Sequence, residues 1–116
     1  MKYTFLLYTN EAAIRDRSPE QSATVIGAHK AYTAALSEAG VLVAMEWLKP
    51  SLTATMLTNV DGKVRTVDGP YAETKEQLGG FYSVDVADLD AAIAWAARCP
   101  TAMYGGKVEI RPAHPH

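Results

Sequence analysis

The chain has 116 residues, of which 48% are hydrophobic and 21% charged, so it fits a single globular domain over residues 1–116 rather than a disordered or fibrous chain. Its formal net charge of -2, without a run of Lys or Arg, argues against nucleic acid as a partner. No apolar stretch approaches the roughly 20 residues of a membrane-spanning helix, and the single cysteine indicates a reducing compartment, so we expect a cytoplasmic protein with no membrane partner, metal site or cofactor.

The first 40 residues predict a strand followed by a helix. Residues 1–9 are rich in aromatic and β-favouring types and predict the strand. Ser18, Pro19 and Gln21 have the spacing of an N-cap, a first helical position and a capping-box partner, so the helix begins there. Apolar residues then recur at helical spacing as far as Gly40, a residue suited to ending a helix. The stripe comprises Val25, Ala28, His29, Tyr32, Ala35, Leu36 and Ala39.

The rest of the chain predicts five strands and one further helix. The expected strands are residues 41–47, 53–60, 63–67, 79–86 and 107–111. The Asp61-Gly62 pair predicts a tight hairpin turn, because both central positions of a type I′ turn need positive φ. Asp88 is placed to cap the helix, and Pro100 prevents it from continuing.

The resulting order β-α-β-β-β-β-α-β predicts an α+β fold. It is a βαββαβ plan with an extra hairpin strand, in which two helices cover one face of an antiparallel sheet. In the last strand, alternation directs Val108 and Ile110 toward the helices and Glu109 and Arg111 away from them. The helix-free face is partly apolar, so we expect another protein surface to cover it. A second copy of the chain is its simplest partner, so we expect a homodimer.

One segment of the sequence is distinctive. Residues 68–82 read Asp-Gly-Pro-Tyr-Ala-Glu-Thr-Lys-Glu-Gln-Leu-Gly-Gly-Phe-Tyr, which closely resembles the signature of the DGPF type of the YCII-related family. Residues 89–97 and 108–112 extend the resemblance over nearly the whole chain, while Tyr71 stands where the family usually has phenylalanine. The resemblance implies a ferredoxin-like domain that packs sheet to sheet into a dimeric α+β barrel.

The same resemblance implies two classes of function. Some YCII relatives look like enzymes, one of them associated with dechlorination of an aromatic ring, and a His/Asp pair has been proposed as their acid–base machinery. This class predicts a protein that binds a small polar or anionic ligand in a cleft, or a cofactor-independent, lyase-like enzyme. Other DGPF members are often encoded beside extracytoplasmic-function sigma factors, which implies a regulatory or interaction module. Whether the chain is an enzyme stays open at this level.

His29 and Asp68 are the candidate catalytic residues. His29 belongs to the apolar stripe of the first helix, where it is either a hydrogen-bonded core residue or, beside a carboxylate, a proton shuttle near neutral pH. It matches the helix-borne histidine of enzyme-like relatives only loosely. The segment from Asp68 to Pro70 is either a turn with special backbone geometry or the mouth of a dimer cleft with a carboxylate base.

The candidate ligand-binding residues are Glu73, Lys75, Glu76 and Arg111. Thr74 and Gln77 have capping-box spacing, which predicts one helical turn that brings the three charged residues of this loop close together. Such a turn is either a solvated face or a loop that binds a polar ligand. Arg111 either pairs with Glu109 within the dimer barrel or holds an anionic substrate through a bidentate contact.

Overall fold

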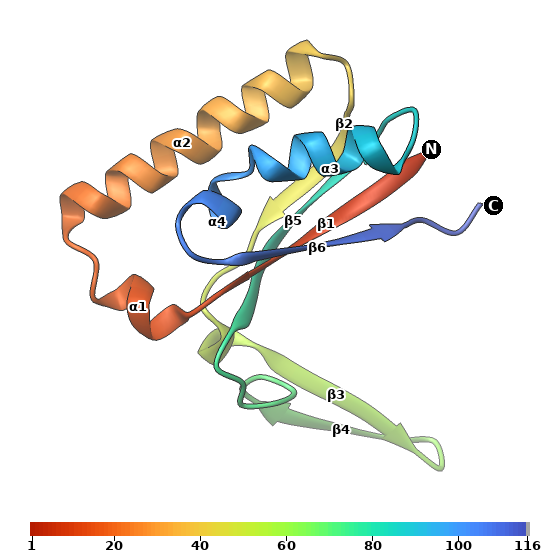
Figure 1. The fold of residues 1–116 in the computed structure, drawn as a ribbon. Helices are drawn as coiled ribbons and strands as arrows, with labels where there is room; N and C mark the ends of the chain where they lie inside the picture. Colours follow the sequence, from red (N-terminus) through yellow and green to blue (C-terminus); the bar gives the residue numbers. More distant parts are fainter. Residues whose placement is uncertain (116) are drawn as a thin grey trace.

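A four-stranded antiparallel sheet in the order β2-β5-β1-β6 forms the centre of the computed structural model, which describes residues 1–115 (Figure 1). Its strands are β1 (Lys2–Thr9), β2 (Leu42–Trp47), β5 (Gln77–Asp85) and β6 (Lys107–Pro112). The two longer helices, α2 (Pro19–Glu38) and α3 (Leu89–Ala97), lie over the same face of the sheet. The predicted α+β, ferredoxin-like plan is therefore confirmed.

The boundaries of α2 arise from local chemistry. The Gln21 amide donates to Ser18 Oγ at 3.1 Å, and the Ser18 amide donates to Gln21 Oε1 at 2.9 Å, so the predicted capping box is complete. Pro19 occupies the first turn, where its missing N–H leaves no bond unmade. After the helix, Gly40 adopts a φ of +73°, as the sequence indicated.

Three short elements were not predicted. They are α1 (Glu11–Arg15), the 3-10 helix η1 (Ser51–Thr53) and α4 (Pro100–Met103). The Asn10 side chain accepts from the Ala13 amide and so caps α1. Pro100 does stop α3 from continuing, but it also occupies the first turn of α4, a position that proline fits well.

The predicted helical turn in residues 73–77 is absent: residues 73 and 74 are irregular, residues 75 and 76 form a bend, and β5 begins at Gln77. Gln77 Oε1 accepts from the Glu11 amide at 3.0 Å, and Gln77 Nε2 donates to the Thr74 carbonyl. The Gln77 side chain therefore fastens the loop to α1, and its oxygen is not available for the capping box that the spacing suggested.

The core of the protein lies between the sheet and the helices. Tyr3, Phe5 and Leu7 of β1 are buried, and Phe5 pairs with the buried Tyr82 of β5. Their sequence neighbours point to the helix-free face, where Leu6 pairs with a half-buried phenylalanine of β5. In β6 the predicted alternation is confirmed: Val108 and Ile110 pack against the core, whereas Glu109 and Arg111 are exposed.

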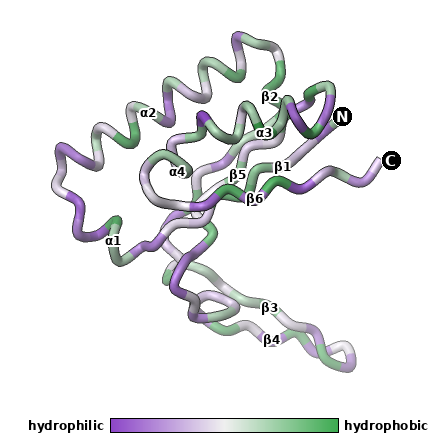
Figure 2. The backbone as a smooth tube through the Cα atoms, viewed as in Figure 1, coloured by the Kyte–Doolittle hydropathy of each residue, from purple (hydrophilic) through white to green (hydrophobic). Residues whose placement is uncertain are grey.

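The hairpin of β3 (Thr55–Val60) and β4 (Lys63–Asp68) forms a two-stranded sheet of its own. It projects from the end of the main sheet on the side away from the helices (Figure 1). Asp61 and Gly62 have φ values of 52° and 79°, which confirms the predicted turn. Hydrophobic residues occur in this hairpin as well as in the main sheet (Figure 2).

Candidate functional site

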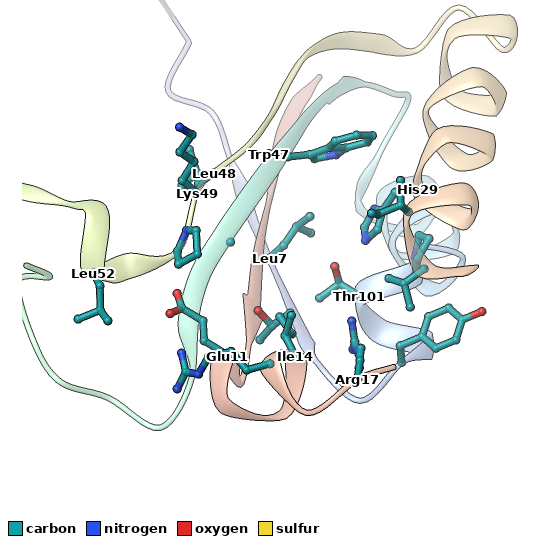
Figure 3. Close-up of a pocket in the computed structure, with 18 residues that line it drawn as sticks. Leu7, Glu11, Ile14, Arg17, His29, Trp47, Leu48, Lys49, Leu52 and Thr101 are labelled. Atoms are coloured by element: carbon teal, nitrogen blue, oxygen red, sulfur yellow. The ribbon is translucent and has the colours of Figure 1, made fainter. Parts of the chain in front are cut away.

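A pocket of about 570 Å³ lies on the helix side of the sheet, between α1, the first half of α2 and the end of β2 (Figure 3). Most of its wall is apolar and is contributed by residues distant in sequence. These include Leu7, Ile14, Val25, Ile26, Leu48 and Leu52. This volume and lining are typical of sites that enclose a small organic molecule.

The charged residues of the pocket are mostly basic. Arg15, Arg17 and Lys49 line it together with one carboxylate, Glu11. The Glu11 carboxylate is engaged, because it accepts from the Ser51 amide at 2.8 Å and from Ser51 Oγ at 3.0 Å. Within the described part of the chain no ion pair holds the three basic side chains. The pocket therefore carries an excess of positive charge that favours an anion.

His29 lines the pocket, and the hydroxyl of Tyr82 anchors its ring. Its Nδ1 lies 3.0 Å from Tyr82 Oη, which also accepts from Trp47 Nε1 at 3.1 Å. Thr33, one turn further along α2, lies 3.3 Å from the same Oη and donates to the His29 carbonyl at 2.8 Å. In Figure 3 the rings of His29 and Trp47 lie side by side above the cavity, toward which Arg17 extends.

One placement of hydrogens that satisfies every contact of this network corresponds to a single tautomer of His29. An indole N–H can only donate, and the Thr33 hydroxyl hydrogen is already directed to the His29 carbonyl. The contact between Thr33 and Tyr82 then needs the tyrosine hydrogen, which leaves Tyr82 Oη as an acceptor for His29 Nδ1–H. In this assignment His29 Nε2 is the unprotonated nitrogen, and no partner for it is described within residues 1–115.

Burial shifts the pKa values of His29 and Tyr82. The pKa of His29 is lowered, mainly because desolvation disfavours the imidazolium and secondly because Arg17 is nearby. The pKa of Tyr82 is raised mainly by burial, although its hydrogen bonds with Thr33 and Trp47 oppose the shift. At neutral pH the pocket therefore contains a neutral imidazole with an accessible lone pair, which is the form that can act as a base.

Gly80 allows Trp47 to reach this network. The two residues are paired across β5 and β2, and a Cβ on Gly80 would lie 2.6 Å from the Glu46 carbonyl oxygen. Only a residue without a side chain lets the two backbones approach so closely. The second glycine of the Gly79-Gly80 pair thus has a structural role next to the site.

The two candidate catalytic residues are not brought together within one chain. His29 lines the pocket, whereas Asp68 is an exposed residue at the end of β4 and is absent from the pocket lining. Gly69, which follows, has a φ of +102° and donates its amide to the Ala54 carbonyl at 2.7 Å. The Asp68-Gly69-Pro70 segment therefore has a clear backbone role, and a catalytic role of Asp68 stays a prediction.

The candidate ligand-binding residues divide among three places. Glu73 and Lys75 line a second pocket of about 410 Å³, which adjoins the first because both include Arg15. Glu76 forms an ion pair of 2.6 Å with Lys107 and so ties the loop to β6. Arg111 is exposed on the opposite, helix-free face of the sheet, remote from the lining of the first pocket.

Several residues of the site were not identified from the sequence. Arg15 and Arg17 flank the break between α1 and α2, and Thr33, Trp47 and Tyr82 hold the imidazole. The Asn10-Glu11 pair at the end of the first strand is an N-cap signal that could have revealed α1 and hence the position of the two arginines. No local pattern distinguishes Tyr82 from an ordinary core aromatic residue.

The described residues show neither a metal-binding cluster nor a membrane-spanning helix. In residues 1–115 no group of three or more His, Cys, Asp or Glu side chains is arranged to hold a metal ion. Across the same residues, no helix has the length and apolar character that crossing a membrane requires.

Comparison with known proteins identifies the family. Residues 1–115 match the YCII-related domain. A protein of Rhizobium meliloti (strain 1021), described as uncharacterized, is 37% identical over 113 residues, a match that covers 97% of this chain and 91% of the relative. Both matches extend well beyond the signature segment, over the strands and helices that build the pocket. The chain therefore belongs to the family of YCII-related domain proteins.

Proposed function

We propose that the pocket on the helix side of the sheet binds a small organic anion with an apolar body, and that His29 exchanges a proton with this ligand. One observation carries the proposal: an apolar cavity combines three basic side chains, free of ion pairs within the described residues, with a neutral imidazole whose Nε2 is unprotonated. The apolar wall would take the body of the ligand, and the arginines would take its carboxylate or similar group.

The chemistry that this set of residues supports is an elimination. His29 Nε2 would take the proton from the carbon next to the anionic or carbonyl group of the ligand, and the electrons of that C–H bond would form a C=C bond. A leaving group on the neighbouring carbon would depart with its bonding pair as an anion. Arg17 would stabilise the negative charge that develops on the ligand oxygen, and the imidazolium would return its proton to solvent.

Binding can be tested with 4-hydroxybenzoate as the probe, because it combines an aromatic body, a carboxylate and a hydroxyl donor. Titration followed by backbone amide NMR is expected to shift resonances of residues that line the pocket. The neutral amide of the same acid should bind at least about tenfold more weakly, because it lacks a charge for Arg17. Arg17→Gln should lower the affinity for the acid by a similar factor and leave the affinity for the amide unchanged.

The matched control is Arg65→Gln, which makes the same chemical change on the exposed hairpin strand. This variant should bind the acid as well as the parent does. Equal affinity for acid and amide, or an Arg17→Gln variant that binds like the parent, would contradict the anion proposal.

Proton exchange can be tested separately with phenylpyruvate, an aromatic α-keto acid with an acidic C–H bond. In deuterium oxide the protein should accelerate loss of the benzylic proton signal above the buffer rate, and His29→Gln should abolish the acceleration. His29→Gln protein that still binds 4-hydroxybenzoate provides the control for folding. If the exchange rate is the same with and without the parent protein, His29 is a ligand contact and does not act as a base.

The sigma-factor association that the resemblance implied stays a prediction. No observation on the described residues favours it over the binding of a small anion.

A further inference from the structure

The second pocket lies beside the first, at the loop that carries the signature segment. Its volume is about 410 Å³, and the loop, α1 and η1 all contribute to its lining. It shares Glu11, Arg15 and Leu52 with the first pocket. Glu73 and Lys75, in contrast, line the second pocket and not the first. A ligand of the second pocket would therefore contact residues that lie outside the site described above.

Hydrogen bonds to backbone atoms hold this loop in place. The Gln77 side chain connects α1 to the Thr74 carbonyl, because its oxygen accepts from an amide of α1 and its nitrogen donates to that carbonyl. Thr74 Oγ1 donates in turn to the Glu76 carbonyl. The backbone beside Glu73 and Lys75 is therefore held by other residues, and the side chains of these two residues take no part.

The charges of the second pocket balance, unlike those of the first. Its lining contains two acidic residues, Glu11 and Glu73, and two basic residues, Arg15 and Lys75. The Glu11 carboxylate is occupied by its two hydrogen bonds from Ser51. Glu73 and Lys75 do not pair with each other, and no other partner for either is described within residues 1–115. Opposite charges that line one pocket without pairing favour a ligand group that carries both charges.

The second pocket also has an apolar wall. Leu52 of η1 is 77% exposed, and it lines the pocket together with Ala12, Pro70 and Ala72. A leucine with this exposure loses apolar contact with water when an aliphatic group packs on it, and this loss is favourable. A short aliphatic chain next to the charged group of a ligand would therefore strengthen its binding here.

We propose that the second pocket binds the α-amino acid group of a ligand with an aliphatic side chain. The ligand ammonium pairs with the Glu73 carboxylate, and the ligand carboxylate pairs with Lys75 and Arg15. The aliphatic side chain packs on Leu52. An α-amino acid carries both charges on one carbon, so a single group satisfies both unpaired side chains. Because Glu73 and Lys75 do not line the first pocket, this proposal stands whether or not an anion binds there.

Three small molecules test whether both charges are recognised. L-Norvaline, an α-amino acid with a propyl side chain, is the probe; pentanoate lacks its ammonium and butylamine lacks its carboxylate. In titrations followed by backbone amide NMR, norvaline should shift the resonances of Ala72, Glu73 and Lys75 saturably, with smaller changes at Val25 and Ile26 of the first pocket. Pentanoate and butylamine should each bind at least about fivefold more weakly, because each loses one of the two charge contacts.

Two variants that each remove one charge assign the contacts. Glu73→Gln should lower the affinity for norvaline at least about fivefold and leave the affinity for pentanoate unchanged. Lys75→Gln should lower the affinity for norvaline and for pentanoate, and leave the affinity for butylamine unchanged. The matched controls, Glu38→Gln on α2 and Lys63→Gln on the hairpin, should bind norvaline as the parent does.

Four results would each overturn the proposal. Norvaline might give no saturable shifts, or its shifts might centre on the first pocket. Pentanoate or butylamine might bind as tightly as norvaline. Glu73→Gln and Lys75→Gln might both bind norvaline like the parent.

Discussion

The main sheet and the β3–β4 hairpin follow the same alternation of side chains with opposite results. In β1 the alternate residues Tyr3, Phe5 and Leu7 are no more than 4% exposed, because the helices cover them. In the hairpin, more than half of the surface of Leu57 and of Val67 is exposed to solvent, although both residues occupy regular strand positions. Strand geometry therefore determines which residues share a face, whereas burial depends on a second layer. The chain supplies that layer for one face of its sheet and for neither face of its hairpin.

The largest expected contrast between the two regions is in the cost of truncating a side chain. Phe5→Ala removes a fully buried ring and should lower the free energy of unfolding by about 3–5 kcal/mol. Leu57→Ala in the hairpin should change it by no more than about 0.5 kcal/mol, because little burial is lost. Urea denaturation followed by circular dichroism, at one protein concentration, measures both. A cost for Leu57→Ala that approached that of Phe5→Ala would mean that the hairpin packs against something in solution on this face.

Glycine substitutions provide a second contrast, within the helix-covered part of the protein. Gly80→Ala places a Cβ against the Glu46 carbonyl at 2.6 Å and should destabilise the protein by about 1–3 kcal/mol, because strand backbones cannot separate without loss of their hydrogen bonds. Gly27→Ala in α2 meets nothing within 4 Å and should stabilise the protein by roughly 0.5–1 kcal/mol. The same denaturation measurement applies. A neutral Gly80→Ala would show that β2 can shift away from β5.

The smallest effect concerns the pH dependence of stability. The pKa of His29 is lowered in the folded state, so the unfolded chain binds this proton first as the pH falls below about 6.5. The contribution of His29 to stability is therefore present above that pH and is lost as the pH falls through the folded pKa. His29→Gln should flatten this part of the stability profile. Nitrogen-15 NMR of the imidazole checks the cause, and Nδ1 rather than Nε2 should carry the hydrogen at neutral pH.

Much of the secondary structure could be predicted from the sequence, because its signals are local. The capping box at Ser18 and Gln21 and the Asp61-Gly62 turn act over four residues or fewer, and both are present in the structure. The prediction of a helical turn at residues 73–77 was wrong for a non-local reason. The Gln77 side chain oxygen that its capping box required accepts instead from the Glu11 amide, 66 residues away in the chain.

The candidate site was predicted only in part. His29 was identified because it occupies a helical stripe, but the alternatives of core residue and proton shuttle could not be separated. The structure shows that His29 is bonded to a core tyrosine through Nδ1 and that it also lines a pocket, so it combines features of both. Arg17 could not be found from the sequence, because its position depends on the break between two helices and on how α1 packs.

The sequence by itself determined the order of the six strands and the two longer helices, the residues that share each face, and membership of the YCII-related family. These properties follow from backbone conformations and side-chain periodicities that each extend over a few residues. Only the tertiary structure decided that His29, Trp47, Thr33 and Tyr82 form one network and that the hairpin stands apart from the sheet. Hydrogen bonds between residues up to 53 positions apart depend on how the layers pack, and no local pattern encodes that packing.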